Sequence, residues 1–199
     1  MNKPAANQFP IHEFIRERWS PRSYKKEKIE NNDLLSMFEA ARWAPSSINE
    51  QPWSFIAATQ EEKESFSKMV YCLGGNNPRW AINASALVII LANNNFEKTG
   101  APNRHSFFDA GLATSQFIFE ATSRGYHSHI MGGFDIQKTT SEFSIPDSHS
   151  VIAFLSVGKI DSPDSLPEDL KARELTDRVR KPLDQILFSE KFGTKSNLI

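Results

Sequence analysis

The 199-residue sequence has little cysteine, little net charge and no long hydrophobic run. Its lone cysteine, Cys72, can form no internal disulfide, which favours a reducing compartment. A formal net charge of −1 gives no general basic surface, so neither nucleic acid nor a membrane is an expected partner. No apolar run approaches the roughly 20 residues needed to span a bilayer, and residues 1–10 lack the apolar centre of a signal peptide. We therefore expect a cytoplasmic protein.

Several chemical signatures are also missing. No Gly-x-Gly-x-x-Gly follows a predicted strand, which argues against a separate dinucleotide-binding domain. No Gly-x-Ser-x-Gly motif is present, which disfavours a hydrolase of that type. His127 and His129 share one face of a predicted strand, but a zinc site needs further ligands at a recognisable spacing. We expect no metal site.

The length fits one compact domain over residues 1–199, with 15 Phe and 4 Trp to fill its core. Apolar periodicity and the positions of proline and glycine predict the secondary structure. Helices are expected over residues 12–18, 34–41, 61–71, 107–123 and 168–175, and strands over 54–59, 86–92, 126–131 and 151–158.

The most informative stretch is residues 44–53, Ala-Pro-Ser-Ser-Ile-Asn-Glu-Gln-Pro-Trp, between a predicted helix and a predicted strand. Pro45 ends the helix, because proline has no amide hydrogen and restricts the preceding residue. Ser46, Ser47 and Asn49 then place hydrogen-bonding groups on a stiff backbone, which suits a planar ligand edged with heteroatoms. A rigid turn that caps the helix would account for the same residues.

Arginines cluster in two segments near the ends of the chain. Arg18, Ser20 and Arg22 follow the first predicted helix, and Arg178 and Arg180 alternate along a predicted extended segment near the C-terminus. Guanidinium forks and a serine hydroxyl are well matched to phosphate oxygens. Taken alone, however, a pair of arginines is usually a solvated surface.

A third candidate is the turn at Gly132 and Gly133, which follows a predicted strand. Two glycines can present bare amides to a ligand, since no side chain stands in the way. An ordinary tight turn explains them equally well.

Together these segments resemble, in the expected order, those of the FMN-dependent nitroreductases. The loop after the second helix of that family is often written Ala-Pro-Ser-Ser-x-Asn-x-Gln-Pro-Trp, and every specified position matches here. The resemblance covers nearly the whole chain. It implies an α+β fold, namely a three-layer α/β/α sandwich around a mainly antiparallel sheet. It also implies an intertwined homodimer with FMN at the interface, in which residues 184–199 form a tail that packs on the partner subunit.

The resemblance assigns phosphate-binding roles to the arginine segments. Arg18 and Ser20 would hold the FMN phosphate, and Arg178 and Arg180 would close on it. Arg22 would lie near the ribityl chain and the N1–C2 edge of the flavin. Trp19 stands where relatives often carry arginine or histidine, so any contact it makes would be through its backbone.

Around the flavin ring the implied contacts come from three more segments. The loop residues would reach the flavin held by the other subunit, and they are Pro45, Ser46, Ser47 and Asn49. Asn77 would reach the pyrimidine edge, although Trp80 stands near the position where some relatives have lysine. The amides of Gly132 and Gly133 would lie beside flavin N5, with Ile130 and Met131 packing against the ring.

The implied activity is hydride transfer from NADH or NADPH through flavin N5 to a small organic acceptor of nitroaromatic or quinone type. Donor and acceptor would use the same place in turn, which is a ping-pong mechanism with no catalytic side chain required. Two alternatives remain open because fold and cofactor do not fix function. One is a flavin-binding protein without NAD(P)H turnover, serving as a store or sensor, and the other is a specialised flavin chemistry such as dehalogenation.

Overall fold

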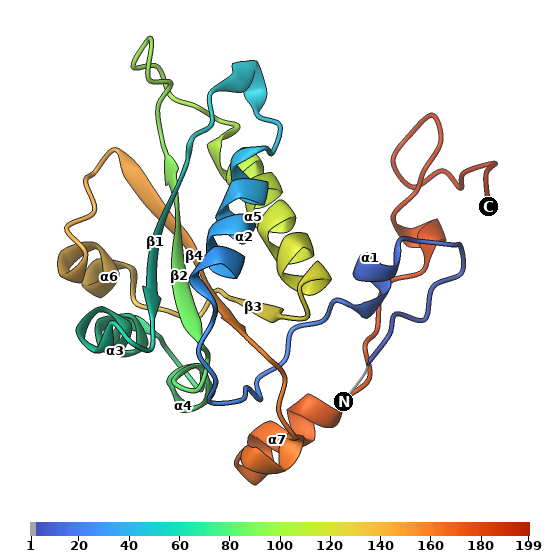
Figure 1. Ribbon diagram of the computed structural model, residues 1–199. Coiled ribbons are helices and arrows are strands. Elements are labelled where there is room, and N and C mark those ends of the chain that lie inside the picture. The colour runs from blue at the N-terminus through green and yellow to red at the C-terminus, as the bar shows by residue number, and fades with distance from the viewer. Residues whose placement is uncertain (1–2) are drawn as a thin grey trace.

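The computed structural model describes residues 3–199 and shows a sheet covered by helices on both faces (Figure 1). The strands are β1 (Trp53–Thr59), β2 (Ala86–Asn93), β3 (His127–Met131) and β4 (His149–Gly158). Their order in the sheet is β1-β2-β4-β3, and every neighbouring pair is antiparallel. β3 therefore lies at one edge of the sheet, with β4 as its neighbour.

Strand β2 supplies side chains to two separate cores, which explains its unbroken apolar sequence. Successive residues of a strand point to opposite faces of the sheet. Accordingly, Val88 and Ile90 pack into one apolar cluster, whereas Leu87 and Ile89 pack into the other. Burial on both faces favours an entirely apolar strand over an alternating one.

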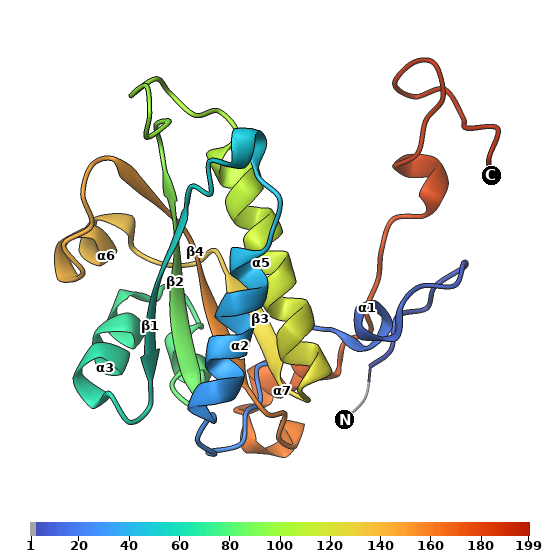
Figure 2. The same cartoon turned by 45° about the horizontal axis from the view of Figure 1, so that its top comes forward.

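Two helical layers complete these cores. Helices α2 (Asn31–Arg42) and α5 (Ser106–Ser123) cover one face, while α3 (Lys63–Cys72), α4 (Pro78–Ala81) and α6 (Ile136–Glu142) cover the other (Figures 1 and 2). On the first side Phe117 of α5 packs into the core, and on the second side Trp80 and Met69 fill the core. The predicted α+β, three-layer architecture around an antiparallel sheet is confirmed.

The predicted elements are all present within a few residues of their expected bounds, but α4 and α6 were missed. Helix α4 has four residues and begins with Pro78 at its first position, inside a stretch whose composition is typical of a turn. Helix α6 is rich in threonine and serine, which are poor helix formers. It is stabilised by Asp135, whose side chain accepts a hydrogen bond from the Lys138 amide at 2.9 Å.

The two ends of the chain lie together, away from the sheet. The N-terminal segment contains α1 (Glu13–Glu17), and the C-terminal segment follows α7 (Glu168–Leu175) and runs past α1 (Figures 1 and 2). Beyond a short 3-10 helix, Leu183–Gln185, the tail leaves large apolar side chains in solvent, including Phe192 at 94% exposure and Leu198 at 81%. Among the helices of the described chain, none has the length and apolar character required to cross a bilayer.

Candidate functional site

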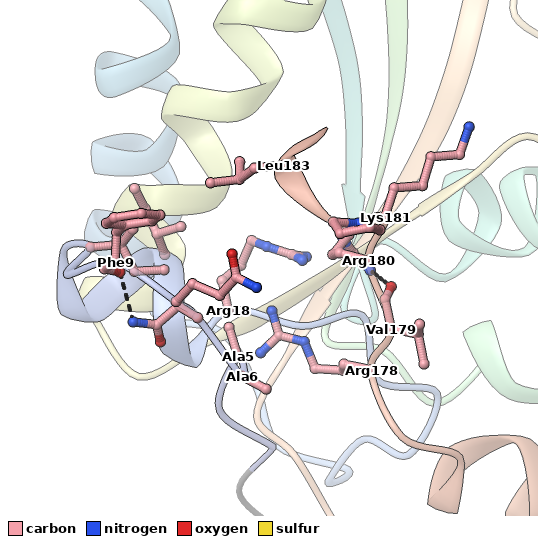
Figure 3. A pocket seen from close by; sticks show the side chains of 14 residues that line it. Ala5, Ala6, Phe9, Arg18, Arg178, Val179, Arg180, Lys181 and Leu183 are labelled. Atoms are coloured by element: carbon pink, nitrogen blue, oxygen red, sulfur yellow. Dashed lines mark hydrogen bonds between the residues drawn. The ribbon is translucent and has the colours of Figure 1, made fainter. Parts of the chain in front are cut away.

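The two arginine segments, about 160 residues apart in the sequence, meet around one cavity of about 600 Å³. Arg18 ends α1, and Arg178 and Arg180 follow α7; all three line the cavity (Figure 3). The Arg178 Nη1 atom donates to the carbonyl oxygens of Lys3 at 2.6 Å and Arg16 at 2.9 Å. These bonds fix the C-terminal segment against the N-terminal one.

Electrostatics in this cluster favour an anion. Within residues 3–199, no carboxylate forms an ion pair with Arg18, Arg178 or Arg180. Burial, together with the nearby charges of Arg178 and Arg180, lowers the pKa of Arg18, and burial with Arg180 lowers that of Arg178. The Ser20 hydroxyl lies 3.4 Å from Arg18 Nη1 and adds a further polar group. Guanidinium groups that repel one another and still have N–H donors available favour the binding of a phosphate.

Arg22 differs from the other three arginines because it has a carboxylate partner. Its Nη1 atom lies 3.7 Å from an Oε2 atom of Glu174, whose side chain is 1% exposed. Sequence analysis missed Glu174, since α7 looks like an ordinary charged helix. Its spacing could have indicated it, because Glu174 lies one helical turn after Leu170 and therefore on the same face of α7. The structure buries both residues.

Edge strand β3 connects the arginine cluster to the glycine turn. The Trp19 ring packs edge-on against His127 at the start of β3, with ring centroids 6.4 Å apart. Two residues further along β3, His129 Nδ1 lies 3.0 Å from the Pro21 carbonyl oxygen. β3 then ends at Met131 and leads into Gly132, roughly 17 Å from its first residue at the usual rise per residue of a strand. The two predicted sites therefore lie at the two ends of one strand.

The glycine turn is held by Asn77, a contact that the sequence did not predict. Asn77 Nδ2 donates to the Gly133 carbonyl oxygen at 3.0 Å, and the Gly74 amide donates to the same oxygen at 2.9 Å. A Cβ atom on Gly133 would lie 3.0 Å from Asn77 Nδ2, so a larger residue would disturb this contact. Gly132 and Gly133 are both exposed, which leaves their backbone accessible to a ligand.

Ile130 and Met131 do not share a surface, contrary to the expectation that both pack against one ring. Ile130 is 47% exposed, whereas Met131 is 2% exposed and belongs to the core beside Phe154. Neighbouring strand residues point to opposite faces, so one planar ligand cannot cover both side chains. Trp80 is likewise a core residue, with its ring 4.7 Å from that of His129.

The two histidines on β3 predict a pH-dependent stability. Burial lowers the pKa of His127 and of His129 from 6.5 to about 4, with Arg18 contributing in both cases. As the pH falls from 6.5 to 4, these histidines therefore become protonated in the unfolded chain but stay neutral in the folded chain. The resulting stability is fully present above pH 6.5. We expect acidification through this window to lower the free energy of unfolding by roughly 3 kcal/mol per histidine.

Urea unfolding of His129→Asn across the same window tests this expectation. Asparagine keeps a donor for the Pro21 carbonyl but cannot take up a proton, so the pH dependence should become shallower. His149→Asn, at the start of β4, is the matched control and should leave the slope unchanged. An unchanged slope in His129→Asn would contradict the assignment.

The loop at residues 44–53 is anchored beside the start of α5, on a different side of the molecule from α1, which leads into Arg18 (Figures 1 and 2). The Ser47 amide donates to Oδ2 of the buried Asp109 at 3.1 Å, and Ser46 Oγ accepts from the Gln51 amide at 3.0 Å. Within this loop Ser47–Asn49 forms a 3-10 turn. Pro45, Ser46, Ser47 and Asn49 are thus not brought to the arginines within one protomer.

This loop also carries backbone strain. Ile48, Asn49 and Gln51 have φ values of 57°, 58° and 52°, in the left-handed region that non-glycine residues seldom occupy. Ile48 is the most strained, because it is β-branched, and its side chain is 84% exposed. Such strain persists where the surrounding structure or a function requires it.

Fold and site together define a three-layer α+β protein with a cluster of arginines at one sheet edge. A family model described as the Nitroreductase family matches residues 15–159. The chain belongs to the nitroreductase family.

Similar solved structures and relatives agree with this assignment. A crystal structure of an oxidoreductase containing FMN is 33% identical, with a TM-score of 0.88 over 95% of this chain and 96% of that one. An FMN-dependent nitroreductase of Clostridium difficile R20291 is 27% identical, with a TM-score of 0.63 over 75% of this chain and 87% of that one. A Bacillus subtilis (strain 168) protein, named as a provisional NAD(P)H nitroreductase, is 26% identical over 74% of this chain and 87% of its own length.

Proposed function

We propose that this chain is an NAD(P)H-dependent FMN oxidoreductase. The observation that carries the proposal is the cluster of Arg18, Arg178 and Arg180, which has no carboxylate partner within residues 3–199 and lies at one end of β3. The bare amides of Gly132 and Gly133 lie at the other end of that strand. A ligand with a phosphate at one end and a polar ring at the other suits both groups. The names of the relatives support the same cofactor and co-substrate.

The donor set fits FMN, and we assign its parts accordingly. Arg18, Ser20, Arg178 and Arg180 would hold the phosphate. Arg22 and Asn77 would bind nearer the ring. The amides of Gly132 and Gly133 would face its N5 edge, and Ile130 would supply an apolar contact. When bound, FMN supplies hydride transfer between a nicotinamide and a second substrate, and the protein supplies orientation and electrostatics. We propose a small organic acceptor, of nitroaromatic or quinone type, and a ping-pong order.

We further propose that the functional unit is a homodimer. The loop residues Pro45, Ser46, Ser47 and Asn49 lie on a different side of the protomer from its own arginines, so they would complete the partner's site. Apolar side chains that the chain leaves uncovered support an interface, among them Phe107 and Phe108 on α5. The tail at residues 184–199 would pack on the partner subunit, with residues 1–199 forming one domain.

Anaerobic spectroscopy of the purified protein tests the proposal. We expect flavin absorbance, its bleaching by NADH or NADPH, and its return when a nitroaromatic or a quinone is added. A colourless protein that cannot take up added FMN would refute the proposal. A yellow protein that neither nicotinamide bleaches would be a flavin-binding protein without this turnover.

A further inference from the structure

Glu174 is a buried carboxylate whose hydrogen bonds are nearly all made by one turn. The Arg22 amide donates to its two carboxylate oxygens at 2.9 and 3.0 Å, and the Ser23 amide donates to Oε1 at 3.2 Å. The Arg22 guanidinium lies beside the same group at 3.7 Å. A buried carboxylate is costly unless such donors satisfy it. The turn therefore stabilises Glu174, and Glu174 in return fixes the turn.

This contact joins the two halves of the arginine cluster. The turn at Arg22 begins four residues after Arg18, and Glu174 lies four residues before Arg178. The Glu174 carbonyl oxygen also accepts a hydrogen bond from Lys3 Nζ at 2.8 Å. The carbonyl oxygen of Lys3 in turn accepts a hydrogen bond from Arg178 Nη1. Glu174 is therefore the point at which the N-terminal arginine segment is docked onto the C-terminal one.

The same carboxylate distributes charge unequally among the arginines. It is paired with Arg22, whereas Arg18 and Arg178 have no carboxylate partner in the described part of the chain. Arg22 is thus largely neutralised by Glu174. The repulsion that an incoming phosphate would relieve is concentrated on the remaining arginines.

We propose that Glu174 is the positioning residue of the phosphate site. By clamping the Arg22–Ser23 amides it sets the separation between Arg18 and the Arg178–Arg180 pair, and by neutralising Arg22 it leaves phosphate binding to the other arginines. This inference rests on the proposed FMN function, and it names a residue that acts through the arginines without touching the cofactor.

Glu174→Gln separates positioning from a simple effect of charge. Glutamine has the same size, but one carboxylate oxygen is replaced by an NH₂ group that faces the donating amides. If Glu174 acted only as a nearby negative charge, its removal would strengthen phosphate binding. A positioning role predicts instead that phosphate binding becomes weaker. We expect affinity for FMN to fall about tenfold, while affinity for riboflavin, which lacks the phosphate, changes by less than about twofold.

The measurement is a fluorescence titration of the apoprotein with FMN and with riboflavin, alongside thermal unfolding of each variant. Unchanged or tighter FMN binding would overturn the proposal, and so would an equal loss for both ligands, since that indicates general destabilisation. Failure of the wild-type protein to bind FMN would overturn the proposed function itself.

Arg22→Ala provides a second test that does not disturb the buried carboxylate's contacts with the backbone. The Arg22 side chain is 26% exposed, and alanine keeps the amide that donates to Glu174. We expect the ratio of FMN affinity to riboflavin affinity to stay within about twofold of wild type, because Arg22 is already neutralised. A fall in that ratio as large as that of Arg18→Ala would overturn the proposal.

Discussion

Replacing Arg18 and Arg180 together by alanine is expected to lower FMN affinity by roughly two to four orders of magnitude. Each arginine would contribute charge-assisted hydrogen bonds to the phosphate, worth about 1.5–3 kcal/mol apiece. The loss is expected to be large because the double substitution removes two of the three arginines that line the cavity. Titration of the apoprotein with FMN at low ionic strength measures the change, and riboflavin binding should be nearly unaffected.

The matched control changes the net charge equally but at a distance. Lys63 and Lys68 lie on α3, in the helical layer opposite α2 and α5, and the structure places neither beside the cavity. Lys63→Ala with Lys68→Ala should bind FMN as the wild type does, since exposed charges are screened by salt and solvent. Full FMN occupancy in the Arg18 and Arg180 double variant would refute their phosphate role.

Removing residues 184–199 is expected to weaken the proposed homodimer roughly a thousandfold or more. The tail exposes Ile186, Phe192 and Leu198, and burying each against a partner would contribute about 1.5–3 kcal/mol. Sedimentation of the full-length and truncated chains over a range of concentrations measures the effect. FMN affinity should fall in parallel, because the partner's Ser46–Asn49 loop would leave the site.

A surface control distinguishes this effect from a general loss of apolar contacts. Tyr71 and Ile82 are exposed on the other helical layer, at 61% and 54%. Tyr71→Ser with Ile82→Ser should leave the dimer intact. If the truncated chain associates with the same concentration dependence as the full chain, the tail is not part of the interface.

Sequence patterns predicted most helices and strands because periodicity reports which faces are buried, whereas the three-layer arrangement came from the family resemblance. The apolar run of β2 indicated burial on both sides, and the structure divides its side chains between two cores. The missed helices α4 and α6 are short and owe their stability to packing and to the Asp135 cap, which no period of 3.6 residues could reveal.

The structure brings some of the predicted site residues together and separates others, and side-chain orientation decides which. The resemblance to the nitroreductases assigned Arg18 and Arg178 to one phosphate, and the structure brings these two residues to one cavity. Met131 was expected to pack against the flavin ring beside Ile130, but it lies in the core, because the sequence does not show which face of this strand is covered. Glu174 was missed because its role depends on amides about 150 residues away.

The meeting of the chain's two ends has a consequence for biosynthesis. The arginine cluster includes Arg180, which comes 22 residues after the end of β4 at Gly158, and it is tied to Lys3 through Arg178. A growing polypeptide can complete its sheet once β4 is made, yet it cannot assemble the proposed cofactor site until the segment after α7 has been made. Under the proposed function, products that stop after Gly158 would retain the four strands of the sheet but acquire no flavin, so flavin fluorescence would report only molecules synthesised past Arg180.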